Sequence, residues 1–396
     1  MTSFSGCSPK APSGNRYLIP WFDATGHYSL QTISLKTYDE PQFFRGKAAQ
    51  IFVEPSDATG KISGSEPVGR YIRRNDGVLV PADEISLDAT AVYAHFEHLR
   101  EIDLGLGVQL KWPATVGIEA VMFTGEGRAK DNALYDGRFD AFLILPSDHS
   151  RLPLTLNGGV LAHEHFHGIF QSEVLLGVKG LLSPRDLSFL HACNWVTAGS
   201  EVNVEEIVKR ATEKKSGLEK DTVVSSSYNA FLLRSLNEGF ADFWAWVYTG
   251  DDDFLAKSLE SEKVFRSLSS PPGKLFTTEQ IQSELSFNSS GRNKDEERAR
   301  FSYNVGTKYA RFMRAAATEI YGKSATDPET RIKFAKTLVS VLPEFKNQMK
   351  TKYSVESVSP DLIVDLLSAK WKKDGLDACA TLKAFKSSGA PVGCNP

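Results

Sequence analysis

The sequence has no apolar run long enough to cross a bilayer. A membrane-spanning helix needs about 20 consecutive apolar residues, and no stretch of the 396 residues approaches that length. A strong charge of either sign is also missing, since 46 basic and 49 acidic side chains leave a formal net charge of -3. Neither nucleic acid nor an anionic membrane surface is therefore indicated as a partner. The length and the 41% apolar content are those of a globular protein with a large core.

Cysteine is scarce, with four residues in the chain. Cys379 and Cys394 flank a short C-terminal tail that contains Gly, Pro and Ser. A disulfide that closes a loop of about 15 residues contributes about 3 kcal/mol in the chain-entropy treatment. We expect these two cysteines to be bonded, and two free thiols in a reducing compartment are the alternative. Cys193, in an apolar segment, is expected to be a buried free thiol.

The remaining cysteine, Cys7, follows Phe4, Ser5 and Gly6 in a pattern that resembles the end of a bacterial lipoprotein signal peptide. The charged and apolar regions that precede such a cysteine are missing, and the familiar pattern favours Leu at the position of Phe4. We expect the sequence to begin inside the signal, and a chance match is the alternative. The resemblance implies a lipid anchor at Cys7 and an extracytoplasmic location: periplasmic, anchored to the outer membrane, or secreted.

Histidine is also scarce, yet three of the eight histidines lie within residues 160–170. This segment reads as a helix that opens at residues 157–159 and carries an apolar stripe. Residues four apart on a helix lie about 40° from each other, so His163 and His167 share a face. Two such imidazoles can hold a zinc ion, and Glu164 lies close enough to meet a metal-bound water. The pattern His-Glu-x-x-His is the zincin signature.

Two other structures remain open for this segment taken alone. The histidines could be packed core residues with satisfied ring nitrogens. Their alternation at His163, His165 and His167 could instead place three imidazoles on one face of a strand, which would be a different metal site. A second motif has to decide.

Glu238 and Asp242 form that second motif, again four residues apart on one face of a helix that is predicted to run to about Tyr248. Two carboxylates are costly to bury without a cation or hydrogen-bond donors, and the residues around them are strongly apolar: Phe240, Phe243, Trp244 and Trp246. Zinc offers one solution, with Glu238 as the third protein ligand and Asp242 bonded to the far nitrogen of a zinc histidine. An exposed acidic face is the alternative.

His-Glu-x-x-His followed by Asn-Glu-Gly-x-x-Asp resembles the gluzincin zinc metallopeptidases, particularly the thermolysin and fungalysin branches. The matching region spans about residues 85–320 of the chain. The resemblance implies roles around a single zinc ion, with these assignments: His163, His167 and Glu238 as ligands, Glu164 as general base, and Asp242 and Asn237 as supporting residues, with Asp242 bonded to His163.

Residues 132–137 resemble the edge strand that precedes the zinc helix in thermolysin-like enzymes. The unpaired main-chain groups of that strand hold an extended peptide, because main-chain hydrogen bonds are tolerant of sequence. The resemblance implies that the substrate is bound by Asn132, Ala133, Leu134 and Tyr135. A plain hairpin is the alternative.

The chain departs from the family pattern in several places. The connection between the two motifs is far longer than in thermolysin, so we expect an inserted helical element over residues 175–225, packed beside or over the cleft. The acidic residues of thermolysin's calcium sites have no clear counterparts, and residues 251–253 either bind calcium or form a solvated turn. The Gly-x-Met-Glu-Asn segment of the aminopeptidase branch is absent. We therefore expect an endopeptidase.

An oxyanion formed at a peptide carbonyl needs a donor in addition to zinc. Thermolysin uses a histidine in its next helix, but no histidine follows His191 in this chain. Tyr303, in a Tyr-x-x-Gly segment that resembles the tyrosine segment of other gluzincins, is the candidate donor, and an ordinary packing tyrosine is the alternative. Tyr228 and Tyr135 are further candidates.

Four regions are expected along the chain. Residues 1–25, rich in Pro, Gly and Ser, are predicted to be a tether. Residues 26–84 carry short alternating runs between turn signals and are predicted to form a small β-rich subdomain. Residues 85–250 are predicted to form the catalytic lobe, and residues 251–396 a mainly helical lobe.

Local patterns place the elements before the zinc helix. A helix of about sixteen residues is predicted to begin at a cap formed by Ser86 or Asp88. Strands are predicted over residues 118–123 and 139–145, and the charge-dense residues 292–300 are predicted to be a solvated loop.

Taken together, the patterns predict an α+β fold: a zincin-like two-lobed metallopeptidase with a mixed β-sheet N-terminal lobe and a helical C-terminal lobe. The expected function is hydrolysis of peptide bonds by zinc-activated water, with Glu164 accepting the proton of the water and returning it to the departing amine. A catalytically inactive zincin that binds peptide or protein, and a zinc hydrolase that acts on a non-peptide amide, remain alternatives.

Overall fold

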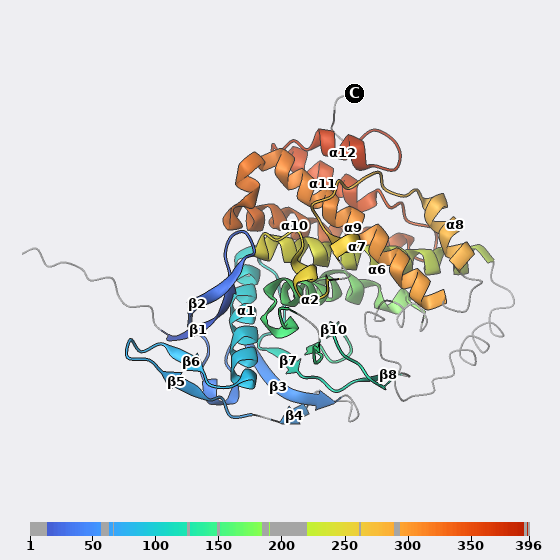
Figure 1. Cartoon of the computed structure of the whole chain (residues 1–396). Coiled ribbons are helices and arrows are strands. Elements are labelled where there is room, and N and C mark those ends of the chain that lie inside the picture. The colour runs from blue at the N-terminus through green and yellow to red at the C-terminus, as the bar shows by residue number, and fades with distance from the viewer. Residues whose placement is uncertain are drawn as a thin grey trace, which may run out of the picture.

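The computed structural model combines helices with mixed β-sheets, in agreement with the α+β class expected from the sequence. It describes residues 14–56, 63–65, 67–124, 127–148, 151–183, 190, 220–260, 263–288, 294–391 and 394. The strands occupy the lower part of the molecule in Figure 1, the last four helices occupy the upper part, and helices α2 and α6 lie between the two.

The first sheet has four strands in the order β2–β1–β6–β5. β1 and β2 form an antiparallel hairpin in which Asn15 pairs with Leu35, and β6 adds to β1 in parallel. The bounds of the strands are β1 (Asn15–Phe22), β2 (Tyr28–Leu35), β5 (Tyr71–Arg73) and β6 (Leu79–Pro81). The tether predicted over residues 1–25 is therefore wrong for residues 15–22, where β1 buries Tyr17 and Ile19 completely.

The second sheet has five strands in the order β10–β11–β7–β3–β4. Its three central strands are parallel, and the two edge strands run antiparallel to their neighbours. The bounds are β3 (Ala49–Ser56), β4 (Ser63–Ser65), β7 (Ala114–Ile118), β10 (Ala133–Asp136) and β11 (Ala141–Ile144), and a separate ribbon pairs β8 (Phe123–Thr124) with β9 (Gly127–Arg128). The strands predicted as one N-terminal subdomain are thus divided between two sheets, since β3 and β4 extend the sheet that contains β7.

Two predicted boundaries in this region are wrong. Helix α1 (Glu84–Leu106) begins earlier than predicted, because Asp83 is the N-cap and accepts the N–H of Ser86 at 2.8 Å. The strand predicted over residues 118–123 lies instead at Ala114–Ile118. Glu119, at φ +53°, turns the chain out of the sheet directly after that strand.

The second half of the described chain is helical, as predicted for residues 251–396. The two helices that carry the motifs are α2 (Gly158–Phe170) and α6 (Lys220–Thr249). The helices that follow them are α7 (Lys263–Arg266), α8 (Thr278–Asn288), α9 (Lys294–Tyr321), α10 (Pro328–Lys352), α11 (Leu362–Lys373) and α12 (Cys379–Phe385). Residues 294–300 belong to α9, so the solvated loop predicted there is wrong. Its Lys, Glu and Arg residues are good helix formers.

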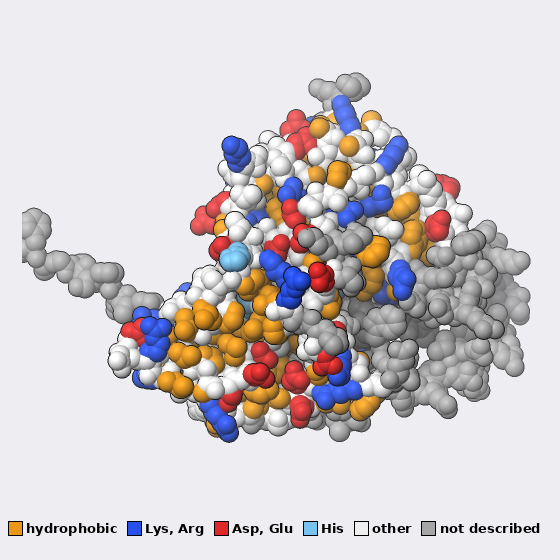
Figure 2. Space-filling view, viewed as in Figure 1, with side chains coloured by type: hydrophobic (Ala, Val, Ile, Leu, Met, Phe, Trp, Pro, Cys, Tyr) orange, Lys and Arg blue, Asp and Glu red, His pale blue; other side chains and the backbone are white. Residues whose placement is uncertain are grey.

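One large apolar core joins the motif helices to the helical half. α6 packs against both α2 and α9, and the core includes Phe166, Trp244 and Phe312. Figure 2 shows acidic and basic side chains mixed over the helical half on the face in view, as the balanced net charge suggests. Within the described residues, no helix is both long and apolar enough to span a bilayer.

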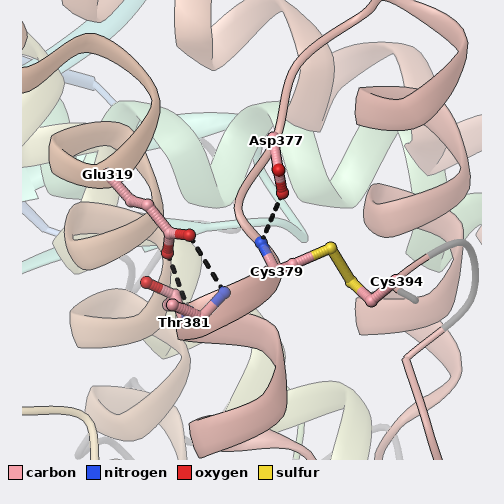
Figure 3. Close-up of a disulfide and its surroundings, with 6 residues drawn as sticks. Glu319, Asp377, Cys379, Thr381 and Cys394 are labelled. Atoms are coloured by element: carbon pink, nitrogen blue, oxygen red, sulfur yellow. Dashed lines mark hydrogen bonds between the residues drawn. A yellow bond between two sulfur atoms is a disulfide. The ribbon is translucent and has the colours of Figure 1, made fainter. Parts of the chain in front are cut away.

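A disulfide joins Cys379 to Cys394, as predicted (Figure 3). Cys379 opens α12, where its N–H donates to Asp377 at 2.9 Å. The carboxylate of Glu319 on α9 accepts the next two N–H groups, those of Ala380 and Thr381. The disulfide therefore holds the tail against a helix start that is already anchored to α9. Cys7 and Cys193 lie outside the described residues.

Candidate metal centre

Helix α2 starts where its sequence provides a cap. The side chain of Asn157 accepts the N–H groups of Gly159 and Val160, and its own amide donates to the carbonyl of Phe254 at 2.9 Å. A Cβ at Gly159 would lie 2.6 Å from the side chain of Phe254, so only glycine permits this close approach. All thirteen residues of α2 are buried. The strand alternative for this segment is excluded.

Helix α6 presents the second motif to α2. Gly239, next to Glu238, lies where α6 meets α9, and a Cβ there would stand 2.1 Å from the carbonyl oxygen of Gly306. The glycine in Asn-Glu-Gly therefore allows two helix backbones to touch. This close contact fixes the face of α6 that carries Glu238 and Asp242.

Three side chains from these helices converge on one point. The Nε2 atoms of His163 and His167 are 3.1 Å apart, and Oε2 of Glu238 lies 3.6 and 3.9 Å from them. Ligand atoms around a tetrahedral ion with bonds of about 2.0–2.1 Å lie about 3.3 Å apart. These residues form the single metal-ligating group of this kind found within the described residues. The site fits a metal ion.

The far nitrogens of both rings face polar side chains, and the two Nε2 atoms face each other. Nδ1 of His163 lies 3.0 Å from Oδ1 of Asp242, and Nδ1 of His167 lies 2.9 Å from Oδ1 of Asn237. Two bare lone pairs at 3.1 Å repel, so the two nitrogens share either a proton or a cation. The donor set of two imidazoles and one carboxylate is therefore suited to bind a cation.

The pKa values of the two histidines reflect the charges around them. Burial opposes a charged ring at His163, but the carboxylates of Asp242 and Glu238 raise its pKa to about 9. Burial lowers the pKa of His167 to about 4. The carboxylates thus favour a positive charge on the His163 side of the centre, whereas the His167 ring stays neutral.

Glu164 lies beside the three ligand atoms without belonging to them. Its Oε2 is 4.0 Å from Nε2 of His167, and it accepts the main-chain N–H of Tyr135 at 2.9 Å. Burial raises the pKa of Glu164 to about 7, with the charge of His163 acting in the opposite direction. A carboxylate of that basicity is suited to exchange a proton near neutral pH.

β10 forms the open edge of its sheet next to this carboxylate. Asn132 and Leu145 are hydrogen-bonded across the pair, so the alternation of an antiparallel ladder turns the main-chain groups of Ala133 and Tyr135 outwards. The N–H of Ala133 is accepted by Oδ1 of Asn132. The structure thus brings residues 132–135 beside Glu164, on an edge that can receive another strand.

Arg266 joins the centre although no sequence pattern indicates it. Its guanidinium makes two contacts with Asp242, at 3.1 and 2.5 Å, and lies 3.7 Å from Oε2 of Glu238. Its side chain is 10% exposed. Arg311 on α9 holds the segment by donating to the carbonyl of Ser267. A short helix of unremarkable composition supplies this residue, so only the tertiary structure reveals it.

Tyr303 packs against Arg266, whose guanidinium carbon lies 4.7 Å from the middle of the tyrosine ring. This contact places Tyr303 next to the metal centre. Tyr228 is buried with its hydroxyl 3.5 Å from Thr278, and the hydroxyl of Tyr135 donates to Asp140. A donor role for Tyr303 stays a prediction.

Other candidates are placed away from the ligands. His165 bonds Asp103 at 3.0 Å, and His95 bonds the hydroxyl of Tyr248. In the acidic turn of residues 251–253, Asp251 pairs with Lys257 and Asp252 pairs with Arg314, so these carboxylates are neutralised by side chains. His191 and most of the predicted insert at residues 175–225 lie outside the described residues.

Searches of protein-family models and of curated protein sequences found no match to this chain.

Proposed function

We propose that the chain is a zinc-dependent peptidase of the gluzincin type, with the two-lobed zincin fold of the thermolysin and fungalysin branches. The observation that carries this proposal is the convergence of the His163, His167 and Glu238 ligand atoms next to a buried, hydrogen-bonded Glu164. An open strand edge beside that carboxylate supplies a place for an extended peptide.

Zinc suits the donor set better than calcium or magnesium do. Two imidazole nitrogens and one carboxylate oxygen are typical zinc ligands, whereas calcium and magnesium prefer oxygen alone. Three protein ligands are the arrangement of catalytic rather than structural zinc. When bound, the ion would activate a water molecule and polarise a carbonyl.

Residues of this protein account for proton transfer, substrate alignment and stabilisation of the oxyanion. Glu164 accepts a proton from the attacking water and returns it to the departing amine. The outward main-chain carbonyl groups of Ala133 and Tyr135 align the substrate, because the N–H groups of these residues already donate to Asn132 and Glu164. Arg266 keeps Asp242 and Glu238 charged and oriented, and Tyr303 is the candidate donor to the developing oxyanion.

An extracytoplasmic location is part of this proposal. The disulfide between Cys379 and Cys394 supports it, because disulfides persist in oxidising compartments and are rare in the cytosol.

The test is cleavage of a mixed peptide library by zinc-loaded protein, with and without a chelator, using Glu164→Gln and Glu173→Gln as matched variants. Glu173 carries the same side chain nine residues further along the chain, outside the ligand set. We expect chelator-sensitive cleavage that survives Glu173→Gln and is lost in Glu164→Gln, while that variant still binds zinc. Equal turnover by Glu164→Gln would exclude the mechanism. Peptide binding by the wild type without cleavage would favour a non-catalytic zincin.

A further inference from the structure

A cavity of about 310 Å³ lies at the carboxyl ends of β7 and β11 and shares no residue with the metal centre. Its polar lining includes Glu84 and Asp88 from the first turns of α1, Glu119 directly after β7, and Thr155 from the segment before α2. Figure 1 shows α1 running alongside β3 and β7. The carboxyl ends of parallel strands are the usual location of ligand sites in open sheets.

The carboxylates of this cavity have no ion-pair partner among the described residues. No lysine or arginine is among its lining residues. Arg128 donates to the main-chain carbonyl of Glu119 at 3.4 Å, and its charge partly offsets the rise in the pKa of that carboxyl caused by burial. Burial raises the pKa of Asp88 to about 6, and the charges of Glu119 and Glu84 add to that effect. The cavity therefore favours a positively charged ligand.

A buried hydroxyl on the same wall also lacks a partner. Thr155 is 4% exposed, and its Oγ1 makes no hydrogen bond to the described residues, although it lies near enough to Asp88 to counteract the rise of that pKa. A buried hydroxyl without a partner is uncommon in native proteins. Thr155 could accept a hydrogen bond from a guest that also neutralises Asp88.

The shape of the cavity and the rest of its lining distinguish between a metal ion and an organic cation as the ligand. The three carboxylates do not bring their oxygens close enough together to hold one metal ion, since the described residues form such a group only at His163, His167 and Glu238. The volume exceeds that of a single ion, and much of the wall is aliphatic: Leu87, Leu145, Pro153, Leu154 and Leu156. An extended cation with a hydrocarbon body matches both the charge and the wall.

We propose that this cavity binds a linear aliphatic amine, with an ammonium group against Asp88 and Glu119 and the hydrocarbon chain along the leucines. The ammonium donates to the two carboxylates and to Thr155, and the methylene groups leave water. The site is independent of the metal centre and of the proposed peptidase activity.

Isothermal titration with 1,5-diaminopentane tests this proposal, with 1,5-pentanediol as the neutral probe and calcium as the metal probe. The variants are Asp88→Asn, Asp88→Asn with Glu119→Gln, and Glu344→Gln, which removes a charge from the exposed surface of α10. We expect saturable 1:1 binding of the diamine by the full chain, weakened at least tenfold by Asp88→Asn and lost in the double variant.

The diol should not bind, and Glu344→Gln and Glu164→Gln should bind the diamine like the wild type. Asp88→Asn should fold, because it removes a buried charge and keeps the side-chain volume. Absence of saturable binding, equal binding by the double variant, or calcium binding lost in Asp88→Asn would each overturn the proposal.

Discussion

The main-chain N–H of Tyr135 donates a hydrogen bond of 2.9 Å to Oε2 of Glu164. A residue of the strand edge thereby holds the carboxylate expected to act as general base. Because one hydrogen bond connects the two, the edge strand and the metal helix form a single unit. Movement of the strand would displace the base from the ligand atom of His167, Nε2, which lies 4.0 Å away.

Asp242→Asn should weaken zinc binding about 10- to 100-fold, because the carboxylate lies 3.0 Å from Nδ1 of His163 and fixes the orientation of that ring. Competition with a chromophoric chelator measures the affinity. Asp374→Asn, which loses an exposed carboxylate near the end of α11, is the control and should bind zinc like the wild type. Unchanged affinity in Asp242→Asn would show that this contact does not support a ligand.

Arg266→Met should destabilise the metal-free protein by about 3–5 kcal/mol, because it leaves the buried carboxylates of Asp242 and Glu238 without their cation. Zinc should reduce this loss, since the ion neutralises the same carboxylates. Urea unfolding with and without zinc measures both quantities. Arg74→Met, which breaks an exposed pair with Asp76, should change stability by less than about 1 kcal/mol. An equal loss with and without zinc would contradict the link to the metal centre.

Gly239→Ala should destabilise the fold by about 1–3 kcal/mol and weaken zinc binding, because the new methyl group meets the carbonyl of Gly306 and pushes α6 away from α9. Gly105→Ala is the matched control. Among the described residues, no atom beyond its chain neighbours and its own helix lies within 4 Å of the Cβ position, and the substitution should leave stability equal or slightly higher. Thermal unfolding and zinc titration compare the two variants, and a neutral Gly239→Ala would mean that the helices have room to adjust.

Replacing both cysteines in Cys379→Ser/Cys394→Ser should lower the free energy of unfolding by about 3 kcal/mol, through the loss of a loop constraint in the unfolded chain. Zinc affinity should not change, because the bond lies on α12, away from the motif helices. Guanidinium unfolding of oxidised, reduced and substituted protein checks this. Equal stability of the three forms would show that the tail contributes nothing to the fold.

The parts of the site that depend on local spacing could be predicted from the sequence. His163 and His167 lie one helical turn apart, as do Glu238 and Asp242, so each pair shares a face whatever the rest of the chain does. Arg266 could not be predicted, since its contact with Asp242 depends on how α7 is held against α9.

The boundaries that were wrong depend on single residues. Pro20 and the nearby Gly and Ser residues are typical of a tether, yet Pro20 is accommodated in β1, which pairs with β2. The apolar pattern predicts a strand that continues past residue 118, but the positive φ of Glu119, which only the backbone shows, ends β7 at Ile118. The start of α1 is hard to predict because Asp83, Ser86 and Asp88 are all good caps, and composition does not distinguish among them.

The most direct test of the proposed centre is a crystal of the zinc-soaked protein measured on both sides of the zinc absorption edge. We expect one anomalous peak about 2.0–2.2 Å from Nε2 of His163, Nε2 of His167 and Oε2 of Glu238, with Glu164 outside bonding distance. A zinc peak elsewhere with none between α2 and α6, or a carboxylate of Glu238 turned away from the ion, would contradict the proposal.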